Sequence, residues 1–121
     1  MINQIVLMGN LTGDPERTET RSGTPVAYCR LAVDRDFINA DGIRETDFFD
    51  VTAYNKTAEH MLRYFRKGQA VIVTGAMQCN RWEDQNGTRR ESWKVVAQRT
   101  WFGDRKAAGP APEEDEGMLP S

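Results

Sequence analysis

The chain has 121 residues, which suits one domain with its own core, and no apolar stretch approaches the roughly 18 residues of a membrane span. Its net charge of −2 and isoelectric point near 5.4 argue, taken alone, against a nucleic-acid partner. Two distant cysteines, Cys29 and Cys79, with one histidine fit neither a disulfide framework nor a zinc site, so we expect no cofactor.

Three strands are predicted in the first half of the chain. Residues 4–8 form a short apolar run closed by a Gly-Asn pair, which is typical of a buried strand. After a loop rich in Gly and Pro, residues 26–33 alternate between apolar and polar side chains. The Asp-Gly pair at 41–42 marks a hairpin turn into a third strand, which ends near Tyr54.

One amphipathic helix is predicted next, because residues 58, 61, 62 and 65 are apolar at helical spacing, and it ends before Lys67. Residues 71–77 return to a strand pattern, the Asn-Gly pair at 86–87 predicts a two-residue hairpin turn, and residues 92–102 form the last strand. The chain is therefore predicted to be all-β. Five strands with one helix between the third and fourth is the order of the OB-fold, a Greek-key barrel that binds oligonucleotides.

The composition changes after Lys106. Residues 107–121 hold Ala, Gly and Pro followed by four acids, and they bury too little apolar surface to fold. We expect an OB-fold domain over residues 1–106 and a disordered acidic tail over residues 107–121. All 16 Lys and Arg lie in the first part with 14 of the 18 acids, which gives it +2 and leaves the tail with −4. The acidic balance of the whole chain therefore hides a mildly basic body.

Large aromatic side chains are predicted on polar strand faces. Odd-numbered residues of the third strand are apolar and are expected to face the core, so its even-numbered aromatics share the other face with Asp50 and Thr52. Trp82 falls on the polar side of the fourth strand, provided that no bulge at Gly75 breaks the register. A single exposed ring is common on protein surfaces, but several together fit stacking on bases. The predicted stacking residues are Phe37, Phe48, Tyr54 and Trp82.

Basic residues flank these aromatics or lie on connected loops, where their charges are placed to follow a phosphate backbone. The predicted backbone contacts are Arg35, Lys56, Lys67, Arg81, Arg89 and Arg90. Arg17, Arg21 and Arg105 are interpreted as solvated charges. Strand parity leaves Trp93 and Trp101 open between the core, a subunit interface and the surface.

The chain resembles bacterial single-stranded DNA-binding proteins over about residues 2–103. The motifs that carry the resemblance lie at residues 3–11, 14–15, 46–49, 54–59, 66–68, 75 and 81–87. The resemblance implies sequence-independent binding and protection of single-stranded DNA in replication, recombination and repair. It also implies a homotetramer in the cytoplasm, associated with the nucleoid. The family's stacking positions fall on the same four aromatics, with Phe37 and Phe48 where family members often have Trp.

The tail departs from the family pattern, in which an acidic run leads to a terminal Pro-Phe. Here the last residue is Ser121, without an aromatic. Replication and repair proteins would bind through the acids and a short apolar segment, namely Glu113, Glu114, Asp115, Glu116, Met118 and Leu119. An inert, solubilising end is the alternative interpretation.

Two other classes of function compete with DNA coating. An enzyme is not expected, because the one histidine, His60, lies off the apolar helix face and no Gly-rich phosphate loop is present. An OB-fold primosome-type adaptor would use the same face for a protein partner. Such an adaptor needs no set of four aligned aromatics, so the aromatics favour DNA.

Overall fold

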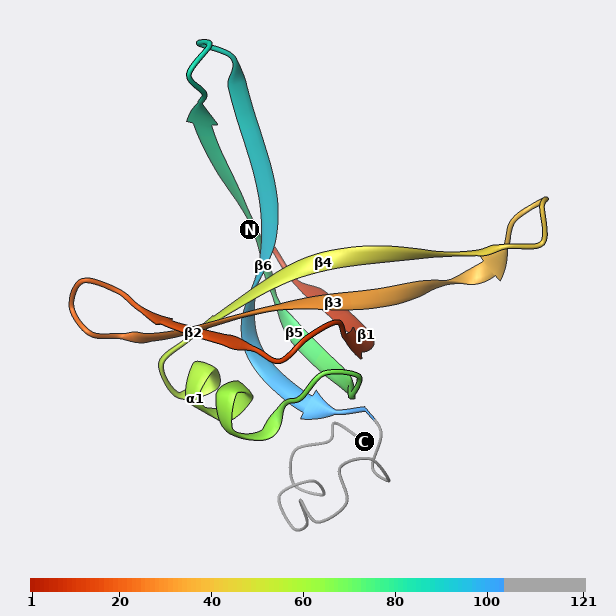
Figure 1. Cartoon of the computed structure of the whole chain (residues 1–121), viewed down its shortest axis with the longest axis horizontal. Helices are drawn as coiled ribbons and strands as arrows, with labels where there is room; N and C mark the ends of the chain where they lie inside the picture. The colour runs from red at the N-terminus through yellow and green to blue at the C-terminus, as the bar shows by residue number, and fades with distance from the viewer. Residues whose placement is uncertain (104–121) are drawn as a thin grey trace.

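The computed structural model describes residues 1–103, which form six strands and one helix (Figure 1). The elements are β1 (Ile5–Leu11), β2 (Glu16–Glu19), β3 (Pro25–Ile38), β4 (Arg44–Tyr54), α1 (Asn55–Tyr64), β5 (Ala70–Glu83) and β6 (Arg89–Phe102). The predicted tail and the domain boundary after residue 106 lie outside the described residues. Within residues 1–103, no helix has the length and apolar character needed to cross a membrane.

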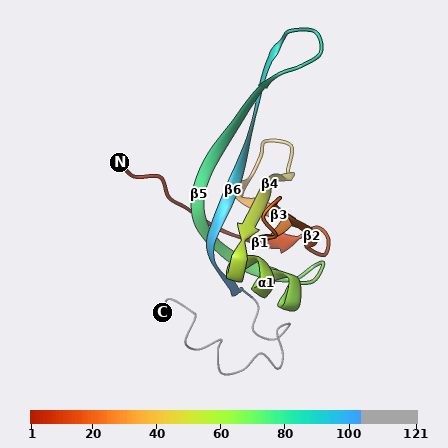
Figure 2. The same ribbon diagram turned by 90° about the vertical axis from the view of Figure 1, so that its left-hand side faces the viewer.

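The strands form one sheet that closes on itself. Their order is β1-β5-β6-β4-β3-β2, and β1 also pairs with β3, which closes a barrel of five strands (Figure 2). The pairing of β4 with β6 is parallel and the other pairings are antiparallel. The predicted all-β OB-fold barrel is confirmed, with its helix between the strands that the sequence analysis numbers third and fourth.

The extra strand, β2, lies where a loop is predicted. Its four residues are all exposed and pair only with β3, from Glu16 opposite Tyr28 to Glu19 opposite Pro25. Because neither face of β2 meets the core, its sequence carries no apolar alternation that would indicate a strand. Backbone pairing with β3 holds it in the sheet.

Three hairpins close with the same kind of turn. In each, a glycine with positive φ donates its N–H to the carbonyl three residues earlier: Gly23 to Thr20, Gly42 to Asn39 and Gly87 to Asp84. The prediction of a two-residue turn at residues 86–87 is therefore wrong. The turn begins at Asp84, and of the Asn-Gly pair only the glycine takes the left-handed conformation, which it adopts without steric cost.

The core fills the barrel, and α1 covers one end of it. Fully buried side chains include Leu31, Val51, Val73, Val95, Met61 and Phe65. Of the predicted helical face, Ala58 and Met61 are buried and Leu62 is partly buried, but α1 ends at Tyr64, before Phe65. Phe65, directly after the helix, is also buried and packs edge-on against Phe102, with ring centroids 5.6 Å apart.

Two hairpin arms extend beyond the barrel, one from β3–β4 and one from β5–β6 (Figure 1). Pairing continues to Ile38 opposite Arg44 in the first arm and to Glu83 opposite Arg89 in the second. β3, β5 and β6 are longer than predicted because both faces of an arm meet solvent, whereas β4 agrees with the prediction. Ladder hydrogen bonds persist there without the apolar alternation that marks a strand in the sequence.

Candidate nucleic-acid interface

The outer face of β3 and β4 carries the aromatics that parity predicts. Residues directly opposite each other share a face, and Ala32 lies opposite Phe48, Arg30 opposite Asp50 and Val26 opposite Tyr54. The Phe48 side chain is 56% exposed, with the Arg30 guanidinium 5.6 Å from its ring centroid. The even-numbered aromatics of this strand therefore lie outside the core, as predicted.

Tyr54 is partly buried at the end of the same face. The ammonium of Lys94 lies 6.0 Å from its ring centroid and 3.5 Å from its hydroxyl oxygen. Thr52, predicted on the polar face, is only 2% exposed, with Tyr28 of β3 and Val96 of β6 directly opposite it on the two sides of that face. Tyr54 thus offers a ring that is already in contact with a cation.

Trp82 lies on the second arm and is 47% exposed. The prediction for Trp82 required that no bulge at Gly75 break the alternation of its strand. The register shift beside Gly75 places the extra residue, Gln98, on β6, so the alternation along β5 is unbroken. A hollow of about 490 Å³ surrounds the indole and gathers three of the predicted basic residues. Its lining residues are Arg81, Trp82, Glu83, Arg89, Arg90 and Glu91.

Phe37 is 61% exposed, near the far end of β3. It falls in the stretch between Asp34 and Ile38 where the pairing with β4 is irregular. Ile38 and Ile43 are also more than half exposed. Phe37 therefore lies on the first arm and not in the hollow around Trp82.

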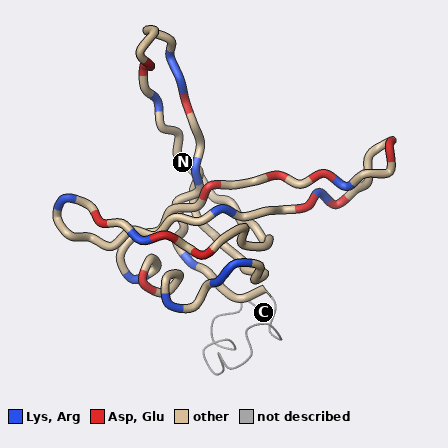
Figure 3. Tube along the Cα trace, in the orientation of Figure 1, with Lys and Arg blue, Asp and Glu red and all other residues tan. Residues whose placement is uncertain are grey.

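Three of the six predicted basic residues hold carboxylates in the protein without DNA. Arg35 donates two hydrogen bonds to Asp47 and lies 3.8 Å from Glu45. Arg90 pairs with Asp84 at 2.9 Å, and Arg81 lies 3.6 Å from Glu91. Acidic and basic residues accordingly follow one another along both arms (Figure 3).

These pairs shift the titration of their members. The guanidinium of Arg35 holds the pKa of the Asp47 carboxyl below its ordinary value, and the carboxylate raises the pKa of Arg35. The pKa of Asp84 is also lowered, by the Arg90 side chain and by backbone N–H groups of Thr88 and Asn86. The carboxylates are therefore charged at neutral pH and compete with phosphate for the arginines.

The other three predicted contacts are placed differently. Arg89 makes no ion pair within residues 1–103 and lines the Trp82 hollow. Lys56 lines a separate hollow with His60, Arg99 and Trp101. Lys67 follows the helix, where its backbone N–H donates to Asp14. The structure thus brings Arg81, Arg89 and Arg90 together, but not Lys56 or Lys67.

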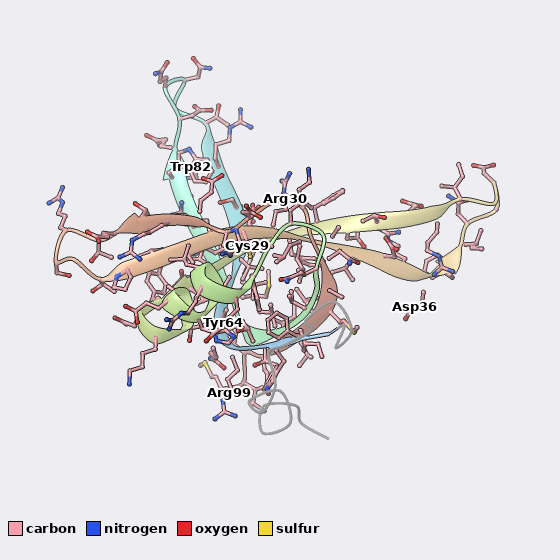
Figure 4. All side chains as sticks on the ribbon, turned by 60° about the horizontal axis from the view of Figure 1, so that its bottom comes forward. Cys29, Arg30, Asp36, Tyr64, Trp82 and Arg99 are labelled. Carbon is pink, nitrogen blue, oxygen red and sulfur yellow. The ribbon has the colours of Figure 1, made fainter. Side chains whose placement is uncertain are left out.

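A further groove lies at the base of the two arms. Cys29 and Arg30 of β3, both labelled in Figure 4, belong to its lining. Trp82, on β5, lies outside it. The groove measures about 390 Å³. Its lining includes Tyr28, Arg30, Asp50, Thr52, Trp93 and Lys94.

Exposure separates the two tryptophans that parity leaves open. Trp101 is only 7% exposed but lies on the outer face of β6, opposite Ile72, because the extra residue Gln98 shifts the alternation after Ala97. Trp93 is 51% exposed. The parity of Trp93 is that of the core residue Val95, but the second arm has left the barrel at that point. The exposure of Tyr28 could be predicted from the sequence, because Tyr28 alternates with the apolar residues of the second predicted strand. No pattern in the sequence predicts the exposure of Trp93.

Comparison with known proteins gives a consistent result. The model of the Single-strand binding protein family matches residues 2–102. A single-stranded DNA-binding protein of Thermotoga maritima is 43% identical over 116 residues, covering 94% of this chain and 82% of that protein. One of Caldanaerobacter subterraneus is 37% identical over 119 residues, covering 96% and 79%. Single-stranded DNA-binding protein 1 of Staphylococcus aureus is 41% identical over 106 residues, covering 88% and 68%. The match extends over nearly the whole barrel and both arms, and the chain belongs to the Single-strand binding protein family.

Proposed function

We propose that this chain binds single-stranded DNA without sequence specificity and protects it. The observation that carries the proposal is the hollow on the second arm, where a half-exposed indole, Trp82, lies among Arg81, Arg89 and Arg90. Stacking on an aromatic ring accepts every base, because every base has a π face. The relatives named above are single-stranded DNA-binding proteins, which supports the same partner.

The binding mode follows from the chemistry of the two arms. Bases stack on Phe37, Phe48, Tyr54 and Trp82, while arginine side chains contact phosphates. Arg35, Arg81 and Arg90 exchange their carboxylate partners for phosphate oxygens, which accept the same planar, charge-assisted hydrogen bonds. Duplex DNA is bound poorly because its bases are already stacked on one another.

Further parts of the proposal rest on the family alone. We place the protein in replication, recombination and repair, as a homotetramer that binds DNA cooperatively and has no catalytic activity. Residues 1–106 serve as the binding domain and residues 107–121 as an acidic tail that recruits replication and repair proteins. The six tail residues proposed to contact these proteins are Glu113, Glu114, Asp115, Glu116, Met118 and Leu119.

The test is a titration with a long oligo(dT) strand and a matching duplex, followed by tryptophan fluorescence at low and high salt. Quenching by the single strand alone, weakened by salt, is expected because phosphate contacts release counterions. Trp82→Ala should lower the affinity roughly 5- to 150-fold, the equivalent of about 1–3 kcal/mol per stacked base. Its urea midpoint should match the parent chain.

Tyr64→Ala is the matched control. Tyr64 is 39% exposed on α1 and lines neither hollow that holds an exposed tryptophan, so its removal should leave the affinity unchanged. Absence of quenching, or an equal response to duplex, would replace this proposal with the adaptor that uses the same face for a protein partner.

A further inference from the structure

The groove at the base of the two arms holds two aromatic residues that the four stacking positions do not include. Tyr28 comes from β3 and is 46% exposed, and Trp93 comes from β6 and is 51% exposed. At about 390 Å³ the groove falls within the roughly 300–1,000 Å³ of small-molecule sites, so it has room for a nucleotide. Neither ring is needed to fill the barrel.

The groove continues the outer face of the sheet. Thr52, only 2% exposed, forms part of its lining, and it pairs with Tyr28 on one side and with Val96 on the other. Phe48 and Tyr54 lie on this same face of β4. A strand that stacks on those two rings therefore has an adjoining place to pass toward residues 12–14 and Glu16, which also line the groove.

The charges of the groove favour a base over a phosphate. Three carboxylates line it, from Asp14, Glu16 and Asp50, against the two cations Arg30 and Lys94. Both cations are engaged: Arg30 lies 3.4 Å from Asp50, and Lys94 lies above the Tyr54 ring. A net negative lining repels phosphate and an acidic peptide, whereas a neutral base gains from two half-exposed rings and from polar groups at its edge.

We propose that Tyr28 and Trp93 form an additional base-binding position, which is occupied when single-stranded DNA covers the outer face of β3 and β4. The proposal rests on the proposed function and extends it by one site on the path of the strand. The two rings supply stacking surface, and Arg30 and Asp50 offer a donor and an acceptor to the polar edge of the base.

Fluorescence separates the two exposed tryptophans without disturbing the buried one. Trp82→Phe leaves Trp93 and the buried Trp101 as emitters, Trp93→Phe leaves Trp82 and Trp101, and the double variant gives the Trp101 background. Saturating oligo(dT) should quench the Trp82→Phe chain beyond that background. Trp93→Ala should lower the affinity roughly 5- to 150-fold, Tyr28→Ala should act in the same direction, and Tyr64→Ala should have no effect.

Photochemical cross-linking gives a direct readout even if an alanine variant fails to fold. Trypsin cuts the chain so that Trp93 lies in the peptide of residues 91–94, Trp82 in residues 82–89 and Tyr28 in residues 22–30. An oligonucleotide carrying 5-bromouracil should cross-link to the Trp93 or Tyr28 peptide as well as to the Trp82 peptide.

The two proposals fail in different ways. Quenching and cross-linking confined to Trp82, with parental affinity in Trp93→Ala and Tyr28→Ala, would overturn the additional position and leave DNA binding intact. If neither exposed tryptophan responds and no cross-link forms, the proposed function itself is overturned.

Discussion

Arg35 donates two hydrogen bonds to the Asp47 carboxylate, from Nε to Oδ2 at 2.9 Å and from Nη2 to Oδ1 at 3.1 Å. The pair joins β3 to β4 on the first arm and has the planar geometry in which arginine also binds phosphate. A strand of DNA that contacts Arg35 must therefore displace Asp47 or share the guanidinium with it. The Asp47 carboxylate therefore reduces the binding free energy that DNA gains from contacting Arg35.

Replacing Asp47 with asparagine should raise the affinity for single-stranded DNA several-fold at low salt. The change removes a negative charge and makes the Arg35 guanidinium available to phosphate. If one phosphate contact is gained, the slope of log affinity against log salt should become steeper by about 0.7. Fluorescence titrations with oligo(dT) at four or more salt concentrations measure both quantities.

Asp36→Asn is the matched control for this variant. Asp36 lies on the same arm and makes no ion pair within residues 1–103. An equal gain in affinity in both variants would mean that the loss of any negative charge on the arm strengthens DNA binding. That result would contradict the explanation that Asp47→Asn frees the Arg35 guanidinium.

Asp84 predicts an acid-sensitive contribution to stability. Its pKa is lowered in the folded chain by Arg90 and by the N–H groups of Thr88 and Asn86, so the charged carboxylate stabilises the hairpin. This contribution is present above the ordinary pKa of 3.8 and is lost as the pH falls through the lower, folded value. Urea unfolding of the parent and of Asp84→Asn should differ at pH 7 and converge toward pH 3.

Asparagine is the informative substitution at this position because Asn39 caps the first arm in the same way. The Oδ1 of Asn39 accepts from the N–H groups of Asp41 and Ile43, as the Oδ1 of Asp84 accepts from Asn86 and Thr88. Asp84→Asn therefore keeps the turn but removes the charge and, with Oδ2, the acceptor of the Arg90 Nε–H. A difference between the two chains that does not change with pH would assign the stability to the turn geometry instead.

Sequence patterns predict the barrel and not its extensions, for a physical reason. Ala27 and Leu31 are buried, and the alternation around them identifies a strand. Beyond Val33 the same strand runs on to Ile38 with side chains exposed on both faces. Backbone hydrogen bonds and polar side-chain pairs such as Arg35–Asp47 continue the strand there, and neither leaves a trace in the hydrophobic pattern.

Trp93 illustrates the same limit at the candidate site. It shares parity with Val95, which is buried, so alternation leaves the core open as its place beside a subunit interface and the surface. β4 pairs with β6 at Val95 and Val96, and this contact ends before Trp93 is reached. The residue at which the pairing of two strands ends depends on the geometry of the whole barrel. The exposure of Trp93 could therefore not be predicted from the sequence.

Gly75→Ala should destabilise the barrel by roughly 1–3 kcal/mol or more, the usual range for overpacking a tight site. A Cβ at this position would lie 2.1 Å from the backbone oxygen of Val96, which a side-chain rotation cannot relieve. Urea denaturation measures the loss. In Gly13→Ala, where a Cβ meets nothing within 4 Å, the free energy of unfolding should change by less than about 0.5 kcal/mol. Equal stability of the two variants would contradict the close approach of β5 and β6.

Cys29 is a free cysteine, since residues 1–103 contain no disulfide. Its thiol should nevertheless react slowly with alkylating reagents in the folded chain. Burial raises the pKa of its thiol from 9.0 to about 12, which lowers the thiolate fraction at pH 8 about a thousandfold. Because the thiolate is the reactive form, alkylation by iodoacetamide should slow accordingly. The Cys79→Ala chain isolates Cys29, and mass spectrometry follows its labelling with and without urea. Rapid labelling of the folded chain would place the Cys29 thiol in contact with water and contradict its packing against the barrel core.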